Sequence, residues 1–415
     1  MTSQLLPTHI WLVPRVDLTP EQISIVQLGV ETHRLIIGPP GSGKTQCLVH
    51  RTAYLKEKYH VPENRFMVFV FTRVIRKYIE SGFTNLNIPT SCVTNYDAWA
   101  YQLHKKTMHL TIPMKEKAPD YEQIRFNVWN WLIQHPDKQH FFDFVLVDEG
   151  QDFPDFVHDT LRMISHHVTV FADPAQRIFE DGAPESSILK FLQITGKGRH
   201  LLGNYRNSPF TAQLASHFLP SMETRSLYLR QIGSEQQIKE RPLLYIAPTY
   251  EAELDRVAQI INQRMYLNER IGIIVPRNNL VFGLAKGISE RGIDIEVAAR
   301  RNRIGGAEIL CDFTNRAPKI ATYQNAKGLT FDTVILPRLE NRNFPRAAGD
   351  TRKRWLFVGI SRATQWVFLS KVEDSDFDEL EILLEAERDG HLIIQRGSQN
   401  EVSKKENSAD EEVPF

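Results

Sequence analysis

Four residues of this 415-residue chain have the types and the sequence context for chemistry on a chain of phosphates. Lys44 and Thr45 end the stretch GPPGSGKT, which follows an apolar run at residues 35–37 and precedes a helical pattern. Glycines let backbone N–H groups come close to phosphates, the lysine reaches the β- and γ-phosphates, and the hydroxyl holds Mg²⁺. Asp148 and Glu149 follow a second apolar run, FVLV. A carboxylate pair at that place is suited to bind Mg²⁺ through Asp148 and to orient a water molecule through Glu149.

Gln22 lies shortly before the phosphate-binding loop, and two roles are open for it. Thr19 is suited to cap a short helix, with Gln22 three residues on as its capping-box partner. Alternatively, the carboxamide of Gln22 can both donate to and accept from adenine. Its position just before a phosphate-binding loop favours the adenine role. The predicted loop itself comprises Gly38, Pro39, Pro40, Gly41, Ser42, Gly43, Lys44 and Thr45.

Alternating strands and helices must position these residues. Continuous apolar runs predict buried parallel strands, and helical patterns lie between them. The predicted strands are residues 66–71, 144–147, 168–172, 243–247, 271–275, 319–323, 333–337 and 366–370. Ligands bind at the carboxyl ends of strands in such sheets, which is where Thr72 and Arg73 follow residues 66–71. Thr72 has an equally good alternative role as a helix cap. The ring of Tyr205 can stack on a nucleotide base, and the guanidinium of Arg206 can bind a phosphate group through two hydrogen bonds.

The composition and net charge limit the classes of protein to which this chain can belong. An apolar content of 42% is ordinary for a globular protein with large cores. The net charge of zero leaves no chain-wide basic field, so any nucleic-acid binding must come from local patches such as residues 300–303 and 338–354. The three cysteines lie far apart and have no zinc or iron–sulfur spacing. No signal-peptide pattern and no apolar run of membrane-spanning length is present, so we expect a cytoplasmic protein without a membrane partner.

The alternation of elements predicts an α/β fold with two parallel-sheet domains. The first is predicted at residues 1–219, with a short helical insertion at about residues 104–139. The second is predicted at residues 220–395, after a polar, irregular stretch that we interpret as a hinge. Residues 396–415 have almost no apolar content and are predicted to form a disordered tail.

The order and spacing of these motifs resemble the superfamily 1A helicases of the UvrD/Rep/PcrA type. LTPEQ resembles the Q motif of that family, GPPGSGKT resembles motif I, and VLVDEGQDF resembles motif II. FADPAQRIF, LLGNYRNS, ATYQNAKGLTFDTVIL and WLFVGISRAT are similar to motifs III, IV, V and VI. VFTRVIRKY and VTNYDAWAYQL look like motifs Ia and Ib, so the resemblance runs from about residue 18 to residue 370. It implies two RecA-like domains of the P-loop NTPase class, with an ATP cleft between them.

The resemblance also implies cofactors and residue roles. ATP and Mg²⁺ are the implied cofactors, with Gln176 sensing the γ-phosphate and with arginine fingers on the side of the second domain. The implied catalytic residues are Lys44, Glu149, Gln176, Arg206 and Arg362. Besides the loop, the implied nucleotide-binding residues are Gln22, Tyr205, Arg206, Gly328 and Arg362, and the implied metal ligands are Thr45 and Asp148. The implied nucleic-acid contacts are Thr72, Arg73, Tyr96, Phe179 and Thr322.

Departures from the family pattern bear on the expected function. Motif Ib has Asn95, Tyr96 and Asp97 where a threonine, an aromatic residue and a histidine are usual, and motif V has Thr330 where a glutamate is usual. The stretches that would hold the family's large 1B and 2B insertions are short. The resemblance therefore implies a minimal 3′-to-5′ translocase or helicase on single-stranded DNA, with RNA as an alternative. A protein partner, such as a nuclease or another complex subunit, would be needed for unwinding.

Two alternatives to the motor remain open at this point. The first is an ATP-gated regulatory subunit of a defence or repair complex, with little unwinding of its own. The second is a P-loop kinase or phosphotransferase, which would need no second domain bearing Arg362.

Overall fold

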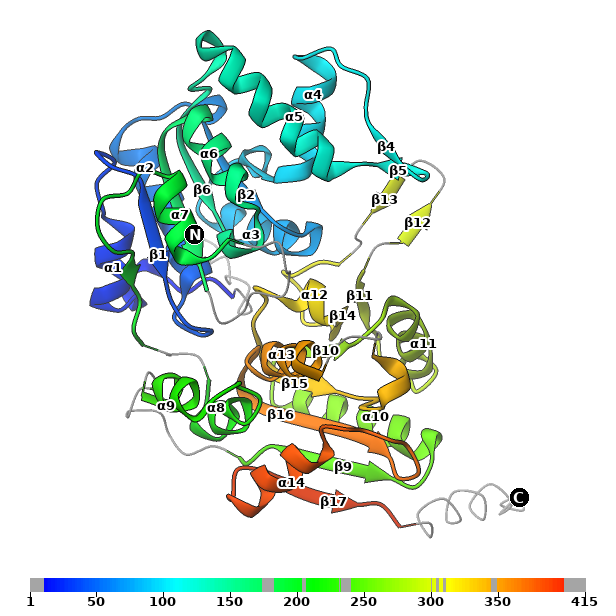
Figure 1. Cartoon of the computed structure of the whole chain (residues 1–415). Coiled ribbons are helices and arrows are strands. Elements are labelled where there is room, and N and C mark those ends of the chain that lie inside the picture. The colour runs from blue at the N-terminus through cyan, green and yellow to red at the C-terminus, as the bar shows by residue number, and fades with distance from the viewer. Residues whose placement is uncertain are drawn as a thin grey trace, which may run out of the picture. The chain divides into compact units, whose positions relative to one another are not determined.

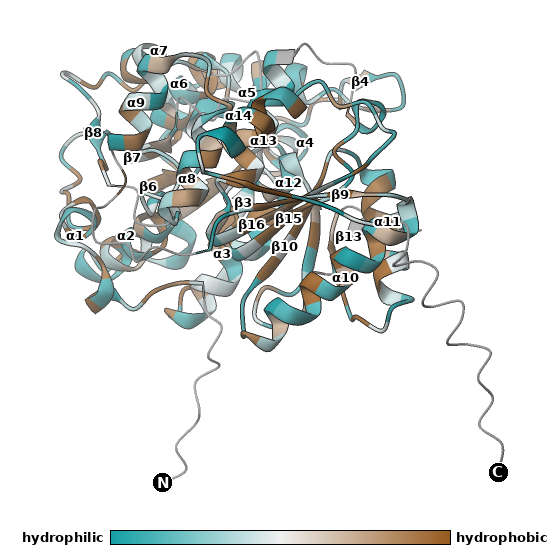
Figure 2. Ribbon diagram, turned by 90° about the horizontal axis from the view of Figure 1, so that it is seen from below, coloured by the Kyte–Doolittle hydropathy of each residue, from teal (hydrophilic) through white to brown (hydrophobic). Residues whose placement is uncertain are grey.

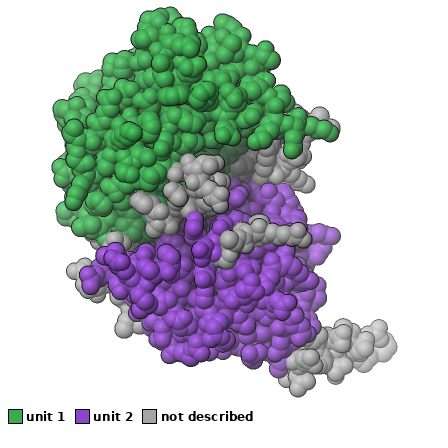
Figure 3. All heavy atoms as spheres, in the orientation of Figure 1, with its two compact units in different colours: residues 1–205 green, residues 206–415 purple. Residues whose placement is uncertain are grey.

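The protein divides into two compact units, residues 1–205 and residues 206–415 (Figure 3). The computed structural model describes residues 11–173, 183–203, 207–230, 232, 240–299, 301–303, 306–308, 311–344 and 349–398. Within those ranges, no helix combines the length and the apolar character that crossing a membrane requires. The predicted tail lies outside the described residues from residue 399 onward.

Unit 1 is built on a six-stranded sheet in which all neighbouring strands are parallel (Figure 1). The strands across the sheet are β3 (Val93–Asn95), β2 (Phe66–Val70), β6 (Phe142–Val147), β7 (Ser165–Ala172), β1 (Arg34–Ile37) and β8 (Arg199–His200). Most side chains of β2, β6 and β7 are buried, which is why these strands have continuous apolar sequences. The strands predicted near residues 66–71, 144–147 and 168–172 are therefore confirmed.

The helices of unit 1 follow the strands of its sheet. They are α1 (Pro20–Val26), α2 (Lys44–Lys58), α3 (Arg73–Asn85), α4 (Tyr96–Lys106), α5 (Tyr121–Gln134), α6 (Asp155–Ile164) and α7 (Glu185–Phe191). The predicted helical insertion at residues 104–139 is only partly helical. Between α4 and α5 lies a small antiparallel hairpin, β4 (Met114–Lys115) and β5 (Ala118–Pro119).

Unit 2 holds a second, seven-stranded sheet, and all of its neighbouring strands are also parallel (Figure 1). Its strands in order are β11 (Glu296–Ala298), β14 (Lys319–Thr322), β10 (Ile271–Val275), β15 (Phe331–Leu336), β16 (Ala363–Val372), β9 (Leu243–Ala247) and β17 (Ile393–Arg396). A separate antiparallel pair is formed by β12 (Arg301–Arg303) and β13 (Gly306–Glu308). Two parallel-sheet α/β units are thus present, as the sequence predicts.

The helices of unit 2 complete its layers. They are α8 (Pro209–Ser216), α9 (Met222–Arg230), α10 (Tyr250–Tyr266), α11 (Asn278–Ser289), α12 (Tyr323–Ala326), α13 (Gly349–Ile360) and α14 (Leu380–Arg388). The central strands β10, β15 and β16 are strongly hydrophobic, as Figure 2 shows, and their buried side chains belong to the core of this unit. The chain continues beyond the predicted last strand through α14 to β17, which forms an edge of the sheet.

The boundary between the two units differs from the predicted one. Residues 207–219, assigned from the sequence to the first domain, lie in unit 2. There Asn207 donates hydrogen bonds to backbone carbonyls at Ser361 and Ala363, so this segment is anchored to the start of β16. Arg362 lies in the turn between α13, which ends at Ile360, and β16.

A partly buried ion pair joins three strands of unit 2. Arg270, just before β10, donates from Nε and Nη2 to the two carboxylate oxygens of Asp332 in β15, at 2.9 and 2.8 Å. The hydroxyl of Thr364 in β16 donates to the same carboxylate at 2.9 Å. Burial raises the pKa of Asp332, but the hydrogen bonds and charge of Arg270 outweigh burial and hold this pKa at about 2.

We expect Asp332→Asn to destabilise unit 2 by about 2–3 kcal/mol near neutral pH. The folded pKa of Asp332 lies below its ordinary value of 3.8, so the carboxylate stabilises the unit above that value. This stabilisation is lost as the pH falls through about 2. Urea unfolding of the wild type and of Asp332→Asn between about pH 7 and pH 3 measures this stabilisation. The difference in their free energies of unfolding should shrink toward the acid end.

The control is Glu290→Gln, which removes an exposed ion pair with Lys286 and should change stability by less than about 0.5 kcal/mol. Equal effects of the two substitutions would contradict the prediction.

Candidate nucleotide-binding site

The phosphate-binding loop of unit 1 joins the end of β1 to the start of α2. Gly41 and Gly43 adopt left-handed backbone conformations, with φ of 88° and 85°, which glycine adopts without strain. A Cβ on Gly38 would collide with Ser42 Oγ. That hydroxyl is buried and has no hydrogen-bond partner among the described residues. A buried polar atom without a partner inside a glycine-rich loop at a helix N-terminus fits a bound phosphate.

Lys44 is buried at the first position of α2 and points back into the loop. Its Nζ donates to the carbonyl oxygens of Gly38 and Pro39 at 2.7 and 3.1 Å. It also forms an ion pair with Asp173 at 3.4 Å, and both side chains are buried. An ammonium group held at this place can bind phosphate oxygens in exchange for these carbonyl oxygens.

The predicted metal ligands lie together. Thr45 Oγ1 donates to Asp148 Oδ2 at 3.3 Å, and both residues are buried. Burial, and then the neighbouring charge of Glu149, raise the pKa of Asp148 above its usual range. A divalent cation would relieve this unfavourable burial of negative charge, because it stabilises the ionised carboxylate. A hydroxyl and a carboxylate are oxygen ligands of the kind that Mg²⁺ prefers, so the pair fits this ion.

Glu149 lies directly after β6 and has a left-handed backbone, with φ of 54°. Its side chain is buried and accepts a hydrogen bond from Gln151 Nε2 at 2.6 Å. The other amide atom of Gln151, Oε1, accepts from the backbone N–H of Asp173 at 2.9 Å. Gln151 therefore joins the predicted water-orienting carboxylate to the end of β7. Neither Gln151 nor Asp173 was among the predicted site residues. Their signal was present, since both follow buried strands in polar clusters.

Gln22 combines the cap with a contact to the loop. Its backbone N–H and side-chain Oε1 form the predicted capping box with Thr19 at the start of α1. Its Nε2 donates to the carbonyl oxygen of Ser42 at 3.0 Å. The capping role is confirmed, and the amide also contacts the phosphate-binding loop. The adenine-binding role of Gln22 stays a prediction.

Several predicted site residues lie outside the described residues. They are Gln176, Phe179, Tyr205 and Arg206. Their predicted roles in γ-phosphate sensing, base stacking, adenine binding and catalysis stay predictions.

Unit 2 positions the remaining predicted nucleotide-binding residues. Arg362 is buried, and its Nε donates to the carbonyl oxygen of Val358 at 3.0 Å. Its Nη2 donates to Ser361 Oγ at 3.3 Å, so the guanidinium is anchored to the last turn of α13. Gly328 has φ of 80°, which explains why a glycine stands in the turn between α12 and β15.

The predicted nucleic-acid contacts have different surroundings. Thr72 and Thr322 each cap a helix at the carboxyl end of a strand, β2 and β14 respectively. Arg73 begins α3 and is exposed. Tyr96, in contrast, is buried at 1% exposure and packs against Phe69 and other rings of the unit 1 core. This position does not support the predicted contact of Tyr96 with nucleic acid, because its ring faces are covered by other side chains.

The departure at Asp97 in motif Ib has a structural explanation. Arg125 of α5 donates from Nε and Nη2 to the two carboxylate oxygens of Asp97, at 2.6 and 2.8 Å. This bidentate pair ties α5 to the first turn of α4. Asp97 therefore serves the packing of the short insertion.

The basic stretch at residues 338–354 is largely neutralised within unit 2. Arg338 is buried in ion pairs with Glu253 and Glu340, at 3.3 and 3.1 Å. Arg352 forms an ion pair with Glu379 at 2.6 Å. These pairs weaken the prediction that the stretch offers a basic surface to nucleic acid. Among its described cations, Arg342, which is paired with Glu340, and Arg354 are exposed.

Two family models match the chain. The UvrD/REP helicase N-terminal domain matches residues 18–112, which include the phosphate-binding loop, and the UvrD-like helicase C-terminal domain matches residues 320–370. The chain is a UvrD-like helicase of superfamily 1A. It is accordingly an ATP-hydrolysing enzyme of the DNA helicase type, and its two parallel-sheet units correspond to RecA-like domains.

Other comparisons of this UvrD-like helicase add little. No curated protein matches its sequence. The C-terminal domain of a possible DNA helicase from Lactobacillus plantarum WCFS1 is one similar solved structure, with 19% identity and a TM-score of 0.35. The similarity covers 46% of this chain and 99% of that one.

Proposed function

We propose that this UvrD-like helicase is an ATP-dependent translocase that moves 3′ to 5′ along single-stranded DNA. The observation that carries the proposal is the buried cluster of Lys44, Thr45, Asp148 and Glu149 in unit 1. These residue types supply a phosphate-binding cation, two metal ligands and a water-orienting carboxylate. Unit 2 adds Arg362, whose anchored guanidinium is suited to stabilise the charge of the transition state.

In this proposal Lys44 leaves the loop carbonyls and binds the β- and γ-phosphates. Thr45 and Asp148 would hold Mg²⁺, which would supply positive charge next to the phosphates. Glu149 orients and activates the attacking water, and Gln151 keeps its carboxylate in place. Hydrolysis would require both units to close on one nucleotide, because the phosphate-binding residues and Arg362 belong to different units. This coupling of closure to chemistry is what would convert hydrolysis into movement.

The proposed path of single-stranded DNA follows the carboxyl ends of the strands. Thr72 and Arg73 after β2, and Thr322 after β14, are the described residues that we assign to it. Phe179, in a segment outside the described residues, is proposed as a stacking platform, which is worth about 1–3 kcal/mol per base in other proteins. Single-stranded RNA is the alternative nucleic acid along which the protein would move.

ATPase assays with and without single-stranded DNA test the motor directly. We expect hydrolysis to be stimulated strongly by single-stranded DNA and less by RNA. Strand displacement on duplexes with a 3′ or a 5′ tail then reports direction, with the 3′-tailed substrate preferred. Equal rates with and without nucleic acid would overturn the translocase proposal while leaving the ATPase in place.

A second function, an ATP-gated regulatory subunit of a defence or repair complex, is favoured by the short insertions. In the described residues, the stretch between α4 and α5 holds only the β4–β5 hairpin. The described parts of the stretch between β10 and β14 hold α11, β11 and the β12–β13 pair. Neither described stretch holds a second helical domain that could engage duplex DNA. We therefore propose that a protein partner, such as a nuclease, supplies the output, and that the complex is cytoplasmic. Unwinding by the isolated chain would argue against this second function.

A further inference from the structure

Three metal-ligating side chains converge in unit 2, outside the proposed nucleotide-binding residues. His217 follows α8, while Asp389 and His391 lie in the turn between α14 and β17. One ligand atom from each residue lies within 4.8 Å of the other two. His217 Nε2 lies 3.0 Å from His391 Nδ1 and 3.7 Å from Asp389 Oδ2. No other group of this kind occurs in the part of the chain that the structure describes.

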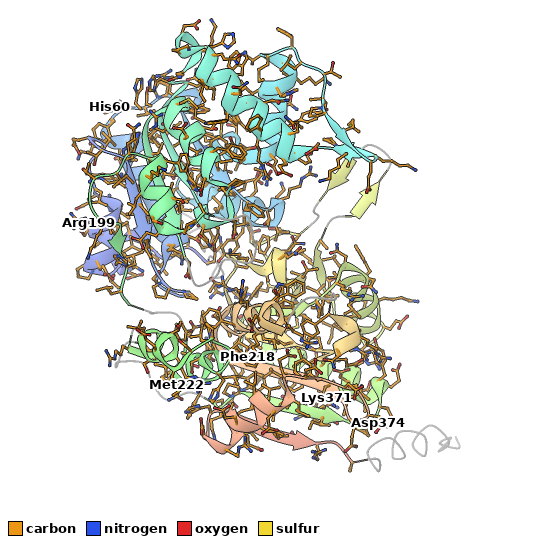
Figure 4. All side chains as sticks on the ribbon, in the orientation of Figure 1. His60, Arg199, Phe218, Met222, Lys371 and Asp374 are labelled. Atoms are coloured by element: carbon orange, nitrogen blue, oxygen red, sulfur yellow. The ribbon has the colours of Figure 1, made fainter. Side chains whose placement is uncertain are left out.

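The backbone holds this turn in one shape. Gly390 is left-handed, with φ of 77°, and its N–H donates to the carbonyl oxygen of Glu387. The N–H of His391 donates back to the carbonyl oxygen of Ala386 at 2.8 Å. These two bonds form a Schellman motif, which ends α14 with a fixed geometry. Asp389 and His391 are thereby presented together, next to the end of α8. Phe218, the residue after His217, is labelled in Figure 4.

His217 carries a second, independent signal. Its side chain is only 1% exposed, and its Nδ1 is buried without a hydrogen-bond partner in the described residues. Glu385 Oε1 lies 3.7 Å from Nδ1, and Arg225 lies 3.6 Å from the same carboxylate. A buried imidazole with one nitrogen facing a carboxylate and the other facing two possible ligands is the arrangement of many metal-binding histidines.

We propose that His217, Asp389 and His391 bind a divalent transition-metal ion, of which Zn²⁺ is the best fit. Ligand atoms on a tetrahedral zinc ion, at bond lengths of about 2.0–2.1 Å, lie about 3.3 Å apart. The observed separations of 3.0 and 3.7 Å bracket that value. Two imidazole nitrogens and one carboxylate favour Zn²⁺ over Mg²⁺ or Ca²⁺, which prefer oxygen ligands. Glu385 would orient His217 through Nδ1, and a water molecule would complete the coordination.

The bound ion would join segments that are far apart in the sequence. His217 directly follows α8, near the start of unit 2. Residues 389–391 lead into β17, the edge strand that pairs with β9. A metal ion there would tie the edge strand to α8. The site is therefore structural, and it is independent of the proposed ATPase.

Zinc binding by the full-length, chelator-treated protein, measured without nucleotide, tests this proposal. Competition with a chromophoric chelator should show one Zn²⁺ bound per chain, with Mg²⁺ unable to displace it. At about a hundredfold excess over Kd, Zn²⁺ should raise Tm by about 5–10 °C. Co²⁺ in place of Zn²⁺ should give the visible absorption of a tetrahedral site.

The variants use the two more accessible ligands, so that folding is preserved. Asp389→Asn and His391→Gln should each weaken zinc binding by at least about tenfold and remove most of the shift in Tm. The matched control is His166→Gln, which removes an exposed histidine that stacks on His140 in unit 1. This control should bind zinc as the wild type does. A hydrogen-bonded histidine pair only, with no stoichiometric binding or with equal binding by all three variants, would overturn the proposal. Neither result bears on ATP hydrolysis.

Discussion

Arg362→Ala is expected to lower kcat for ATP hydrolysis by about 10³–10⁵, the range that arginine fingers supply in related chemistry. The guanidinium would stabilise charge that develops on the phosphate oxygens only in the transition state. Removing it should therefore change kcat far more than the affinity for ATP. The hydrogen bonds to Val358 and Ser361 anchor Arg362 to its own unit, so it is positioned before any nucleotide binds.

Single-turnover hydrolysis and the Kd of a fluorescent ATP analogue separate the two effects of Arg362→Ala. Because Arg362 is buried, the Tm of the variant should be recorded beside its activity. Arg362→Lys keeps the charge without the planar fork and should recover only part of the rate. Arg388→Ala, which removes an exposed arginine of α14, is the matched control and should leave kcat unchanged. Equal losses in rate and affinity for Arg362→Ala would argue against its role as an arginine finger.

Glu149→Gln should lower kcat by about 10²–10⁴ while ATP and Mg²⁺ still bind. The substitution keeps the size of the side chain but removes the carboxylate that would accept a proton from water. It also replaces the acceptor that Gln151 meets at 2.6 Å with an amide, which can still accept through its oxygen. The loop, Lys44 and the metal ligands are untouched, so nucleotide affinity should stay within about threefold of the wild type.

The same two assays measure the effect of Glu149→Gln, together with trapping of ATP on the protein. Glu63→Gln, an exposed glutamate of unit 1, serves as its control and should hydrolyse ATP at the wild-type rate. Hydrolysis that persists in Glu149→Gln would remove the general-base assignment. It would then point to another group near the end of β7, such as Asp173.

Local patterns were enough to predict the phosphate-binding loop and the helix cap beside it. The glycines of the loop, the following Lys44 and Thr45, and the capping box of Thr19 and Gln22 all act within a few residues of one another. Their geometry depends on backbone preferences that the sequence states directly. The buried strands were also readable, because a strand covered on both faces is apolar along its whole length.

Contacts between distant residues were not readable in the same way. Tyr96 looked like a ring for nucleic acid, yet its burial depends on Phe69 and on the packing of α4. The hairpin of β4 and β5 was taken as helix, since so short a pair has no period of its own to detect. Arg338 looked like part of a basic surface, but its partner Glu253 lies far away in the sequence, on α10.

The sequence by itself therefore determined the α/β class, the phosphate-binding loop and the carboxylates after β6, because each depends on neighbours along the chain. Only the tertiary structure decided that Gln151 joins Glu149 to Asp173, that Arg338 is neutralised, and that His217 meets Asp389 and His391. Those contacts arise when parallel strands bring their ends to one edge and when helices pack on the sheets. Each of these sets includes a residue from a distant part of the chain, which no local sequence pattern reveals.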